Sequence, residues 1–531
     1  MQTSGLPTRR GRVGRVVALV MVLGAVGAGC RFIDRVSVSS TEAQASFVSQ
    51  DPSISADGRF VAFVSEARNL VPGDTNGTQD VFVRDVLSGE TTRVSVDSDE
   101  HQANFVNWAP SISADGRFVA FHSSASDLVP GDTNNYWDVF VRDRVAGTTV
   151  RASVSTTGVQ SDGLSVDASI SADGRFVAFT SWAMNLVPDD TTNGGDVFVR
   201  DLVASTTTRV SISSSGVEGD LFSYSPSISS DGRLIAFTSL ASNLVPGDSP
   251  EAEDVYVRDQ QAGTTTKVSV TGVGGQANAD SRFPSISGDG QFVAFQSGAS
   301  DLVPGDTNGA WDVFVRDLGA ASTSRASIGT GGTEPNSISG DASISGDGRF
   351  VAFSSYATNL GAADTNGVFD VFLRDRANGT TTRVSTDTDG LQARNTSWTP
   401  SISGDGRYIA FLSIAPNLVA GDTNGTWDIF VTRSVRPEIT SVTPGTGRRG
   451  AMVTVTLHGS GFVPGMGAVA ARGVSVVSVT TRSETVAELE LSIAGDAQLG
   501  AGPLTVFDPG TLGLATGSAG QCTGCFTVSG T

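Results

Sequence analysis

The sequence predicts an all-β protein in which a seven-bladed β-propeller is followed by a small immunoglobulin-like β-sandwich. The chain contains 63 Gly among 531 residues, and its apolar residues alternate over short runs, as in strands joined by turns. One segment recurs seven times at a constant interval, from Asp57 to Asp115 and onward. After residue 434 the repeat ends, but short alternating runs separated by Gly and Pro continue.

The repeat is clearest in residues 52–63, which read Pro-Ser-Ile-Ser-Ala-Asp-Gly-Arg-Phe-Val-Ala-Phe. Each copy holds four strand-like runs, which in the first copy are 53–55, 60–64, 80–84 and 92–96. The Asp-Gly pair between the first two runs is typical of a tight hairpin turn. Four antiparallel strands at this period predict one blade of a propeller. The pair recurs at Asp57, Asp115, Asp173, Asp231, Asp289, Asp347 and Asp405.

We expect an N-terminal strand at 35–38 to close the ring, which spans residues 31–434. The last repeat lacks its fourth strand, because the chain leaves the pattern after Thr432. Arg35-Val-Ser-Val lies one period before Arg93-Val-Ser-Val and matches the fourth strands of the other repeats. Such a strand would cover a sheet edge that is otherwise exposed.

The repeat resembles the WD-repeat-like propellers of the TolB type, whose blades carry Pro-Ser-x-Ser-x-Asp-Gly-x-x-Ile/Val-Ala-Phe. The resemblance covers about three quarters of the chain and implies a propeller fold. TolB differs in having six blades and an extra N-terminal domain. Its role in an envelope complex is therefore not implied for this chain.

Residues 435–531 resemble an IPT/TIG domain, an immunoglobulin-like sandwich. The resemblance rests on Pro437-Glu-Ile-Thr-Ser-Val-Thr-Pro-Gly, Gly459-Ser-Gly-Phe and Gly502-Pro-Leu-Thr-Val, and it covers roughly residues 437 to 529. In extracellular bacterial proteins it implies a spacer or a contact surface. Cys522 and Cys525 lie in this part, and we predict a disulfide between them, since two ligands do not complete a zinc site.

Residues 1–30 read as an export signal. Four arginines precede an apolar run at 16–28 that is too short to span a bilayer. The run ends Gly-Ala-Gly-Cys30, which resembles a bacterial lipobox except that Gly27 stands where Leu is preferred. The resemblance implies lipidation of Cys30, with ordinary signal cleavage nearby as the alternative. We expect an extracytoplasmic protein, either lipid-anchored to a bacterial cell envelope or secreted.

The connections 65–79 and 97–109 are long, and blade topology places both kinds on one face, where recognition residues are expected. The first of them carries Asp-x-Asn-Gly-x-x-Asp, which places three oxygen donors in a turn and makes the loop a candidate calcium site, although it lacks the fourth acid and the distal Glu of an EF-hand. We favour the other interpretation, in which Asp and Asn form hydrogen-bonded turns at the strand entrance without any ion. The candidate calcium ligands are Asp74, Asn76, Asp80, Asp306, Asn308, Asp312, Asp364, Asn366, Asp370, Asp422, Asn424 and Asp428.

Four aromatic residues share one position in this loop and are candidates for stacking on a sugar or a peptide: Trp137, Trp311, Phe369 and Trp427. The alternative is that they fill space between blades.

The formal charge of −20 disfavours nucleic acid as a partner. The three histidines, His101, His122 and His458, are scattered and lack the context of a catalytic triad. We therefore predict a non-enzymatic binding or scaffold protein whose long-loop face engages an envelope protein or an extracellular glycan. The alternative is a hydrolase or lyase acting on extracellular polysaccharide. No cofactor is predicted with certainty beyond the calcium candidate.

Overall fold

The computed structural model describes residues 33–530 except 193, 249–251, 273, 362–363, 435–437, 463–465, 484 and 508–518. The predicted export signal and Cys30 lie outside these residues. Within them every regular element is a strand, which confirms the all-β prediction. A search of the same residues finds no helix that could cross a membrane.

Residues 33–433 form seven four-stranded antiparallel sheets, numbered here in chain order. Sheet 1 contains β2 (Ser49–Ile54), β3 (Phe60–Ser65), β4 (Asp80–Asp85) and β5 (Glu90–Arg93). Sheet 2 contains β6 (Asn107–Ile112), β7 (Phe118–Ser123), β8 (Asp138–Asp143) and β9 (Thr148–Arg151). Sheet 3 contains β10 (Ser165–Ile170), β11 (Phe176–Ser181), β12 (Asp196–Asp201) and β13 (Thr206–Arg209). Sheet 4 contains β14 (Ser223–Ile228), β15 (Leu234–Ser239), β16 (Asp254–Asp259) and β17 (Thr264–Lys267).

The remaining sheets of this part follow the same order of strands. Sheet 5 contains β18 (Ser281–Ile286), β19 (Phe292–Ser297), β20 (Asp312–Asp317) and β21 (Ser322–Arg325). Sheet 6 contains β22 (Ser339–Ile344), β23 (Phe350–Ser355), β24 (Asp370–Asp375) and β25 (Thr380–Arg383). Sheet 7 contains β26 (Ser397–Ile402), β27 (Tyr408–Ser413), β28 (Asp428–Arg433) and, from the N-terminal end, β1 (Ile33–Arg35).

In sheet 1 the second and third strands match the expected bounds within one residue, whereas the first and fourth strands differ more. The first strand of sheet 1 begins at Ser49 rather than at residue 53, because a β-bulge between Gln50 and Ser53 lets the strand continue past an irregular pair. The fourth strand ends at Arg93 rather than at residue 96, since the chain turns back there and Val96 bridges Gln102 instead.

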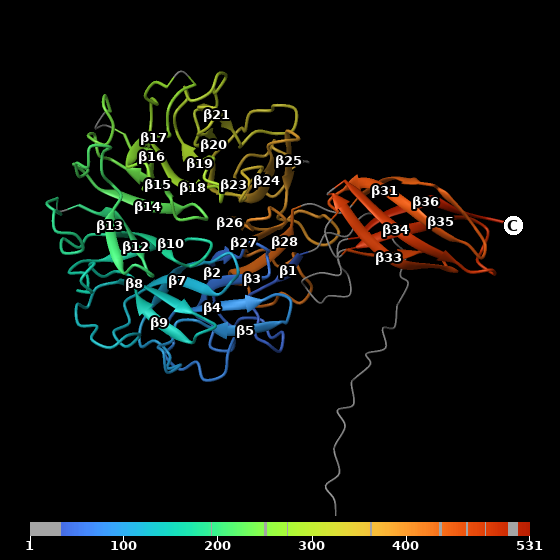
Figure 1. The fold of residues 1–531 in the computed structure, drawn as a ribbon, viewed down its shortest axis with the longest axis horizontal. Coiled ribbons are helices and arrows are strands. Elements are labelled where there is room, and N and C mark those ends of the chain that lie inside the picture. The colour runs from blue at the N-terminus through green and yellow to red at the C-terminus, as the bar shows by residue number, and fades with distance from the viewer. Residues whose placement is uncertain are drawn as a thin grey trace, which may run out of the picture.

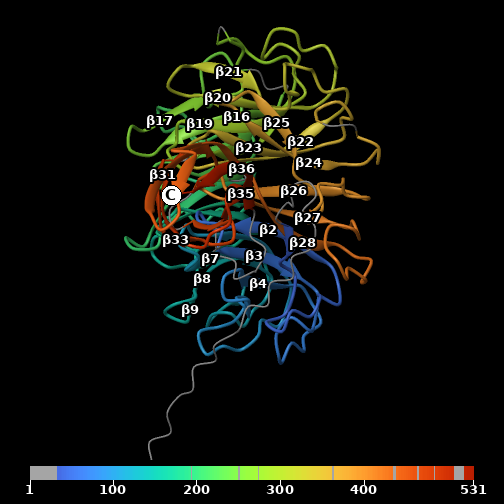
Figure 2. The same cartoon turned by 90° about the vertical axis from the view of Figure 1, so that its right-hand side faces the viewer.

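The first and last sheets meet through the N-terminal segment. β1 runs antiparallel to β28, with Ile33 opposite Thr432 and Arg35 opposite Phe430. The backbone amide of Val36 also donates to the carbonyl oxygen of Ile429 at 2.7 Å. Figure 1 shows β1 beside β28, and Figure 2 shows β26–β28 next to β2–β4. The closing strand is therefore shifted about two residues toward the N-terminus from the predicted 35–38.

A hydrophobic cluster fills each gap between neighbouring sheets. The cluster between sheets 1 and 2, for example, contains Val64, Val83 and Phe121, and the cluster between sheets 7 and 1 contains Val36, Phe63 and Ile429. The alternating apolar residues of the second and third strands supply most of these side chains, because both faces of each sheet are covered. The sheets therefore form a closed ring, which is a β-propeller architecture.

Residues 438–529 form two further four-stranded sheets around a single hydrophobic core. Sheet 8 contains β29 (Glu438–Thr443), β31 (Met452–Ser460), β34 (Val486–Ile493) and β33 (Val474–Ser483). Sheet 9 contains β30 (Thr446–Arg448), β36 (Ala519–Ser529), β35 (Gly500–Phe507) and β32 (Gly467–Ala470).

Cys522 and Cys525 are both free thiols in the structure. They lie on β36 at a register shift, since Gly502 is opposite Phe526 whereas Leu504 is opposite Cys522, and the Cys525 thiol donates to the carbonyl oxygen of Cys522 at 3.5 Å. The disulfide between them stays a prediction. Burial raises the pKa of the Cys525 thiol to about 12.

Candidate functional site

The two faces of the ring differ in their connections. Residues 55–59 and 86–89 form short turns on one face, which we call the short-turn face. Residues 66–79 and 94–106 form long connections on the opposite face, which we call the long-loop face. The same division recurs in the other sheets, so all the long loops gather on one side of the molecule.

A cavity of about 390 Å³ lies at the centre of the ring. Each of the seven innermost strands contributes two adjacent residues at the same repeat position. The first of each pair has a positive φ, between 46° and 54°, because it occupies the β-bulge of that strand. The lining pairs are Asp51 and Pro52, Ala109 and Pro110, Asp167 and Ala168, Ser225 and Pro226, Phe283 and Pro284, Asp341 and Ala342, and Thr399 and Pro400.

Two belts of hydrogen bonds surround the axis on the short-turn side of this cavity. In one belt the amide of Ile112 donates to the Oγ of Ser53 at 3.2 Å, and the same bond joins every neighbouring pair of sheets. In the other belt backbone amides donate to carbonyl oxygens of the next sheet, beginning with Ala56 to Ala114 at 3.1 Å and ending with Asp405 to Ala56 at 2.9 Å. These belts hold the inner strands in place and bring the sheets close together on the short-turn side of the cavity.

Three carboxyl groups line the cavity, and burial raises the pKa of each. The pKa of Asp51 rises to about 6, and the pKa values of Asp167 and Asp341 also rise. The backbone amide of Ala109 partly offsets the effect at Asp51, and the hydroxyl of Ser354 and the backbone amide of Thr399 do so at Asp341. Among the described residues no positively charged side chain contributes at any of the three. The cavity therefore holds acidic groups without a cation of the protein to balance them.

His122 lies directly behind the cavity wall. Its Nδ1 accepts a hydrogen bond from the backbone amide of Asp167 at 3.3 Å, and its ring meets Trp137 edge to face at 5.3 Å. Burial lowers the pKa of His122 to about 4, so the ring is neutral at physiological pH. It supports the bulge and does not counter the charge of Asp167.

The candidate calcium loops already contain a cation from the protein. In sheet 1 the guanidinium of Arg93 lies 3.7 Å from Asp74 and 3.4 Å from Asp80. The amide of Asn76 donates to Asp80 at 3.3 Å, and its oxygen accepts from the backbone amide of Thr78, which is an Asx turn. Asn76 therefore directs its nitrogen, which cannot bind a metal ion, toward the carboxylate.

The same arrangement recurs around the ring, with Lys267 as the cation in sheet 4 and Arg35 in sheet 7. In each sheet the cation pairs with the first and the last Asp of the loop. The pairs are Arg151 with Asp132 and Asp138, Arg209 with Asp190 and Asp196, Lys267 with Asp248 and Asp254, Arg325 with Asp306 and Asp312, Arg383 with Asp364 and Asp370, and Arg35 with Asp422 and Asp428. The amides of Asn308, Asn366 and Asn424 also donate to Asp312, Asp370 and Asp428. The geometry favours hydrogen-bonded turns over calcium sites.

We expect the thermal midpoint of the purified protein to stay within about 1 °C when millimolar calcium is added or removed with a chelator. A bound ion that stabilises the folded state would raise the midpoint in proportion to ln(1 + [Ca²⁺]/Kd). Differential scanning calorimetry with calcium, with magnesium and with EDTA measures this. A rise of several degrees that is specific to calcium would instead favour calcium sites.

Sheet 3 carries an extra acid in this cluster. Glu218 stands where Gln102 stands in sheet 1, and Arg209 faces Asp190, Asp196 and Glu218 at 3.2, 3.4 and 2.5 Å. Burial, together with these neighbouring carboxylates, raises the pKa of Asp190 to about 7. The folded protein therefore keeps a proton on Asp190 that the unfolded chain releases near pH 4, and this contribution to stability declines between about pH 4 and pH 7.

Asp190→Asn is expected to raise the free energy of unfolding at pH 8 by about 1 kcal/mol, allowing for solvent screening, and to have no effect below pH 4. Urea titrations at both pH values measure the difference. Asp143→Asn is the control with the opposite expected effect on the free energy of unfolding. Arg117 lowers the pKa of Asp143 to about 2, so loss of this ion pair destabilises the protein only above that pH. Equal effects of Asp190→Asn at both pH values would contradict the assignment.

The four predicted aromatic residues are half-buried, and each contacts a neighbouring side chain. Trp427 stacks on Trp398 at 5.6 Å, and Phe369 contacts the other side of Trp398 at 6.0 Å. Trp137 contacts His122, and Arg282 lies 4.3 Å above the ring of Trp311. These contacts are those of residues that fill space between sheets, with one side of each ring engaged by the protein itself.

The sequence analysis missed an exposed group of apolar side chains on the long-loop face. Phe47 and Phe105 are 55% and 57% exposed, and Phe222 and Tyr356 are nearly as open. All belong to long connections, and Phe283 reaches the same side from the cavity wall. Other members are Tyr136, Trp182, Met184, Leu221 and Ile338. We call this set the apolar rim.

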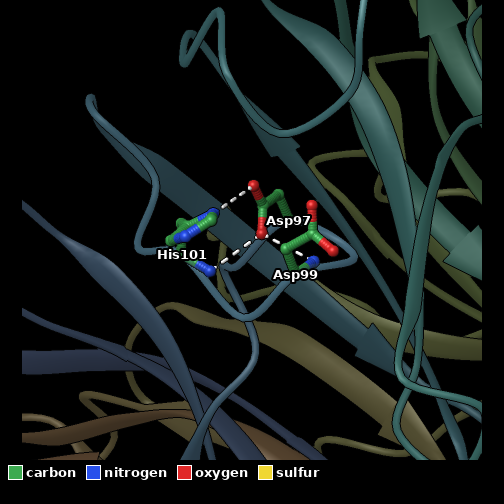
Figure 3. Close-up of side chains that lie close together, drawn as sticks. All are labelled: Asp97, Asp99 and His101. Atoms are coloured by element: carbon green, nitrogen blue, oxygen red, sulfur yellow. Dashed lines mark hydrogen bonds and ion pairs between the residues drawn. The ribbon is translucent and has the colours of Figure 1, made fainter.

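His101 lies in a cluster with Asp97 and Asp99 (Figure 3). Its Nδ1 lies 2.9 Å from Asp97, and the backbone amides of His101 and Asp99 donate to the same carboxylate. Asp97 raises the pKa of His101, whose side chain is 76% exposed. The cluster is a hydrogen-bonded turn in the long connection between β5 and β6, and it is not part of the cavity lining.

No protein-family model matches the chain, and no curated protein matches it. Among solved structures, a putative TolB from Agrobacterium tumefaciens is 16% identical with a TM-score of 0.35, covering 65% of this chain and 94% of that chain. An acylaminoacyl peptidase is 11% identical with a TM-score of 0.43, covering 78% of this chain and 58% of its own. The WD40 repeats of RRP9 are 10% identical with a TM-score of 0.36, covering 77% of this chain and 99% of theirs. The functional argument therefore rests on the geometry of the long-loop face.

Proposed function

We propose that this protein is an exported, non-enzymatic binding protein that engages an extracellular protein or glycan through its long-loop face. The apolar rim carries the proposal. Water-exposed aromatic side chains are enriched at recognition surfaces, and here they lie in the long connections on one face of the ring, with Phe283 lining the central cavity.

The architecture that we assign to it is a seven-bladed propeller over residues 31–434 followed by an IPT/TIG-type domain over residues 435–531. The seven sheets, the 58-residue spacing of Asp57 and Asp115, and the pairing of β1 with β28 support the first part. Two sheets around one core support the second. The arginines and apolar run before Cys30 support export, with a lipid anchor at Cys30 or secretion as the two outcomes.

The test compares binding by the intact protein and by a rim variant carrying Phe47→Ala, Phe105→Ala and Phe222→Ala. Immobilised bacterial polysaccharides and a display library of envelope-protein peptides serve as probes. We expect at least one probe to bind the intact protein and the rim variant to bind it at least tenfold more weakly, since each exposed aromatic anchor contributes about 1 kcal/mol or more.

Val145→Ser and Val203→Ser form the matched control, because these side chains are 76% and 75% exposed on the short-turn face. Equal loss of binding in the control, or no bound probe at all, would overturn the proposal. Release of reducing sugar from a bound polysaccharide would replace it by the hydrolase alternative.

A further inference from the structure

The acidic groups of the central cavity differ from every other set of buried carboxylates in the ring. In each long loop two aspartates share an arginine or lysine, as Asp364 and Asp370 share Arg383. On the short-turn face Asp85 pairs with Arg59 at 2.7 Å. The ring thus supplies an internal cation wherever it buries carboxylates in these repeated positions.

Asp51, Asp167 and Asp341 receive no such cation. No positively charged side chain contributes to the electrostatics of any of them. Arg282 precedes the lining residue Phe283, and its guanidinium lies 4.3 Å from the ring centre of Trp311, 5.3 Å from that of Phe283 and 3.8 Å from the carboxylate of Glu253. His122 is neutral, as described above.

The lining also contains polar groups without a partner. The hydroxyl of Thr399 is buried in the cavity wall and has no hydrogen-bond partner among the described residues. Thr180 is fully buried, and its Oγ1 is likewise unpartnered. Its equivalents His122 and Thr238 accept hydrogen bonds from the lining residues of the next sheet. Unsatisfied polar atoms of this kind are rare in folded proteins and indicate a missing partner.

The three carboxylates are spread around the cavity rather than gathered at one point. They come from sheets 1, 3 and 6, and they do not belong to either group of acids in the described residues whose ligand atoms lie within 4.8 Å of one another. A single metal ion could not reach all three. A cation on a longer stem fits better, because a cavity of about 390 Å³ has room for its carbon chain.

We infer that the central cavity binds a positively charged organic group, a protonated amine or a guanidinium, that enters from the long-loop face. The carboxylates of Asp51, Asp167 and Asp341 in the lining supply the negative charge. The inference deepens the proposed function and rests on it for the face of entry. The cation comes either from a small amine or from a lysine or arginine of a bound polypeptide.

Ligand-observed NMR titrations of the full chain at low ionic strength test this with four probes. These are n-butylamine, n-butanol, acetyl-Gly-Gly-Lys-Gly-Gly-amide and the same peptide with norleucine in place of lysine. We expect each charged probe to bind at least tenfold more tightly than its neutral counterpart. Tight binding of the lysine peptide with weak binding of butylamine assigns the cation to a polypeptide, and equal binding assigns it to small amines.

Asp51→Asn, Asp167→Asn and Asp341→Asn together are expected to weaken binding of the charged probe at least tenfold. The variant should melt no lower than the wild-type protein at pH 8, since burial raises the pKa of all three groups and removal of their charge relieves that cost. Asp167→Asn alone serves if the triple variant does not fold. The control variant carries Asp99→Asn, Asp189→Asn and Asp389→Asn, which remove the same charge from exposed positions.

Equal binding of lysine and norleucine peptides, equal loss in the control variant, or no binding of any charged probe would overturn the inference. The two proposals fail separately. Loss of the Phe47, Phe105 and Phe222 rings tests the rim, whereas the aspartate substitutions test the cavity and leave the rim intact.

Discussion

Arg35→Met is expected to lower the free energy of unfolding by about 3–5 kcal/mol, since breaking a buried ion pair leaves an uncompensated buried charge. The Arg35 guanidinium lies 3.3 Å from Asp422 and 3.5 Å from Asp428, whose side chains are 6% and 0% exposed. Arg35 lies on β1 at the N-terminal end of the ring, whereas the two acids lie on β28 and in the loop before it, at the C-terminal end. This cation therefore also ties the two ends of the ring together. Urea unfolding at pH 7 measures the loss.

Arg35→Lys provides the control, because the protein already uses lysine at this position in sheet 4. Lys267 reaches Asp248 at 2.7 Å and Asp254 at 2.5 Å. We expect Arg35→Lys to retain most of the stability and Asp428→Asn to restore part of it in the Arg35→Met background. If Arg35→Met changes stability by less than about 1 kcal/mol, the cation is not needed for closure.

The repeat made much of the fold predictable from sequence. Seven copies with a constant interval and the Asp-Gly turn defined the two central strands of each sheet within one residue, as the prediction of 60–64 against the observed Phe60–Ser65 shows. The bulge at Asp51 was not predictable in this way. Its positive φ would ordinarily favour glycine or asparagine, and here the hydrogen-bond belts of the inner strands hold other residues in that conformation.

The long connections could be located from the sequence, and the exposed aromatic side chains lie in them; that this face binds a ligand stays a prediction. The structure favours the interpretation in which the repeated loop acids are architectural, because Asp74 and Asp80 bind Arg93. This pairing was not predicted, since Arg93 could be recognised from the sequence only as part of a strand.

The informative signal was variation within the repeat. The cavity position reads Asp51, Ala109, Asp167, Ser225, Phe283, Asp341 and Thr399, beside a serine and an isoleucine that never change. A position that varies this widely, two residues before a constant Ser-Ile pair, is free of the demands of the fold, and comparison of the seven copies column by column could have found it. Only the structure shows that the side chains at this position line a cavity, because the β-bulge turns them toward the axis of the ring.

The closure of the ring leads to a second large effect, at Gly346. A Cβ at this position would lie 2.7 Å from the carbonyl oxygen of Gly404 in the next sheet. That oxygen also accepts the backbone hydrogen bond of Gly346 at 2.8 Å, whereas Ala114 and Ala172 at the same position of sheets 2 and 3 donate their belt bonds at 3.1 Å, so a side chain larger than alanine must push the two sheets apart. Gly346 has no positive φ, and any penalty for a side chain is therefore steric rather than conformational.

Gly346→Val is expected to lower the free energy of unfolding by about 2–3 kcal/mol, as for other overpacked sites. Gly272→Val is the control, because nothing lies within 4 Å of a Cβ at that glycine, which also lacks a positive φ. Urea unfolding of both variants measures the difference. The same loss of stability should appear in a version of the protein that ends after residue 434, because both glycines belong to the ring. A loss of stability that appears only in the full chain would contradict the prediction. It would mean that the clash lies elsewhere and that the belt around the axis does not hold the sheets at this spacing.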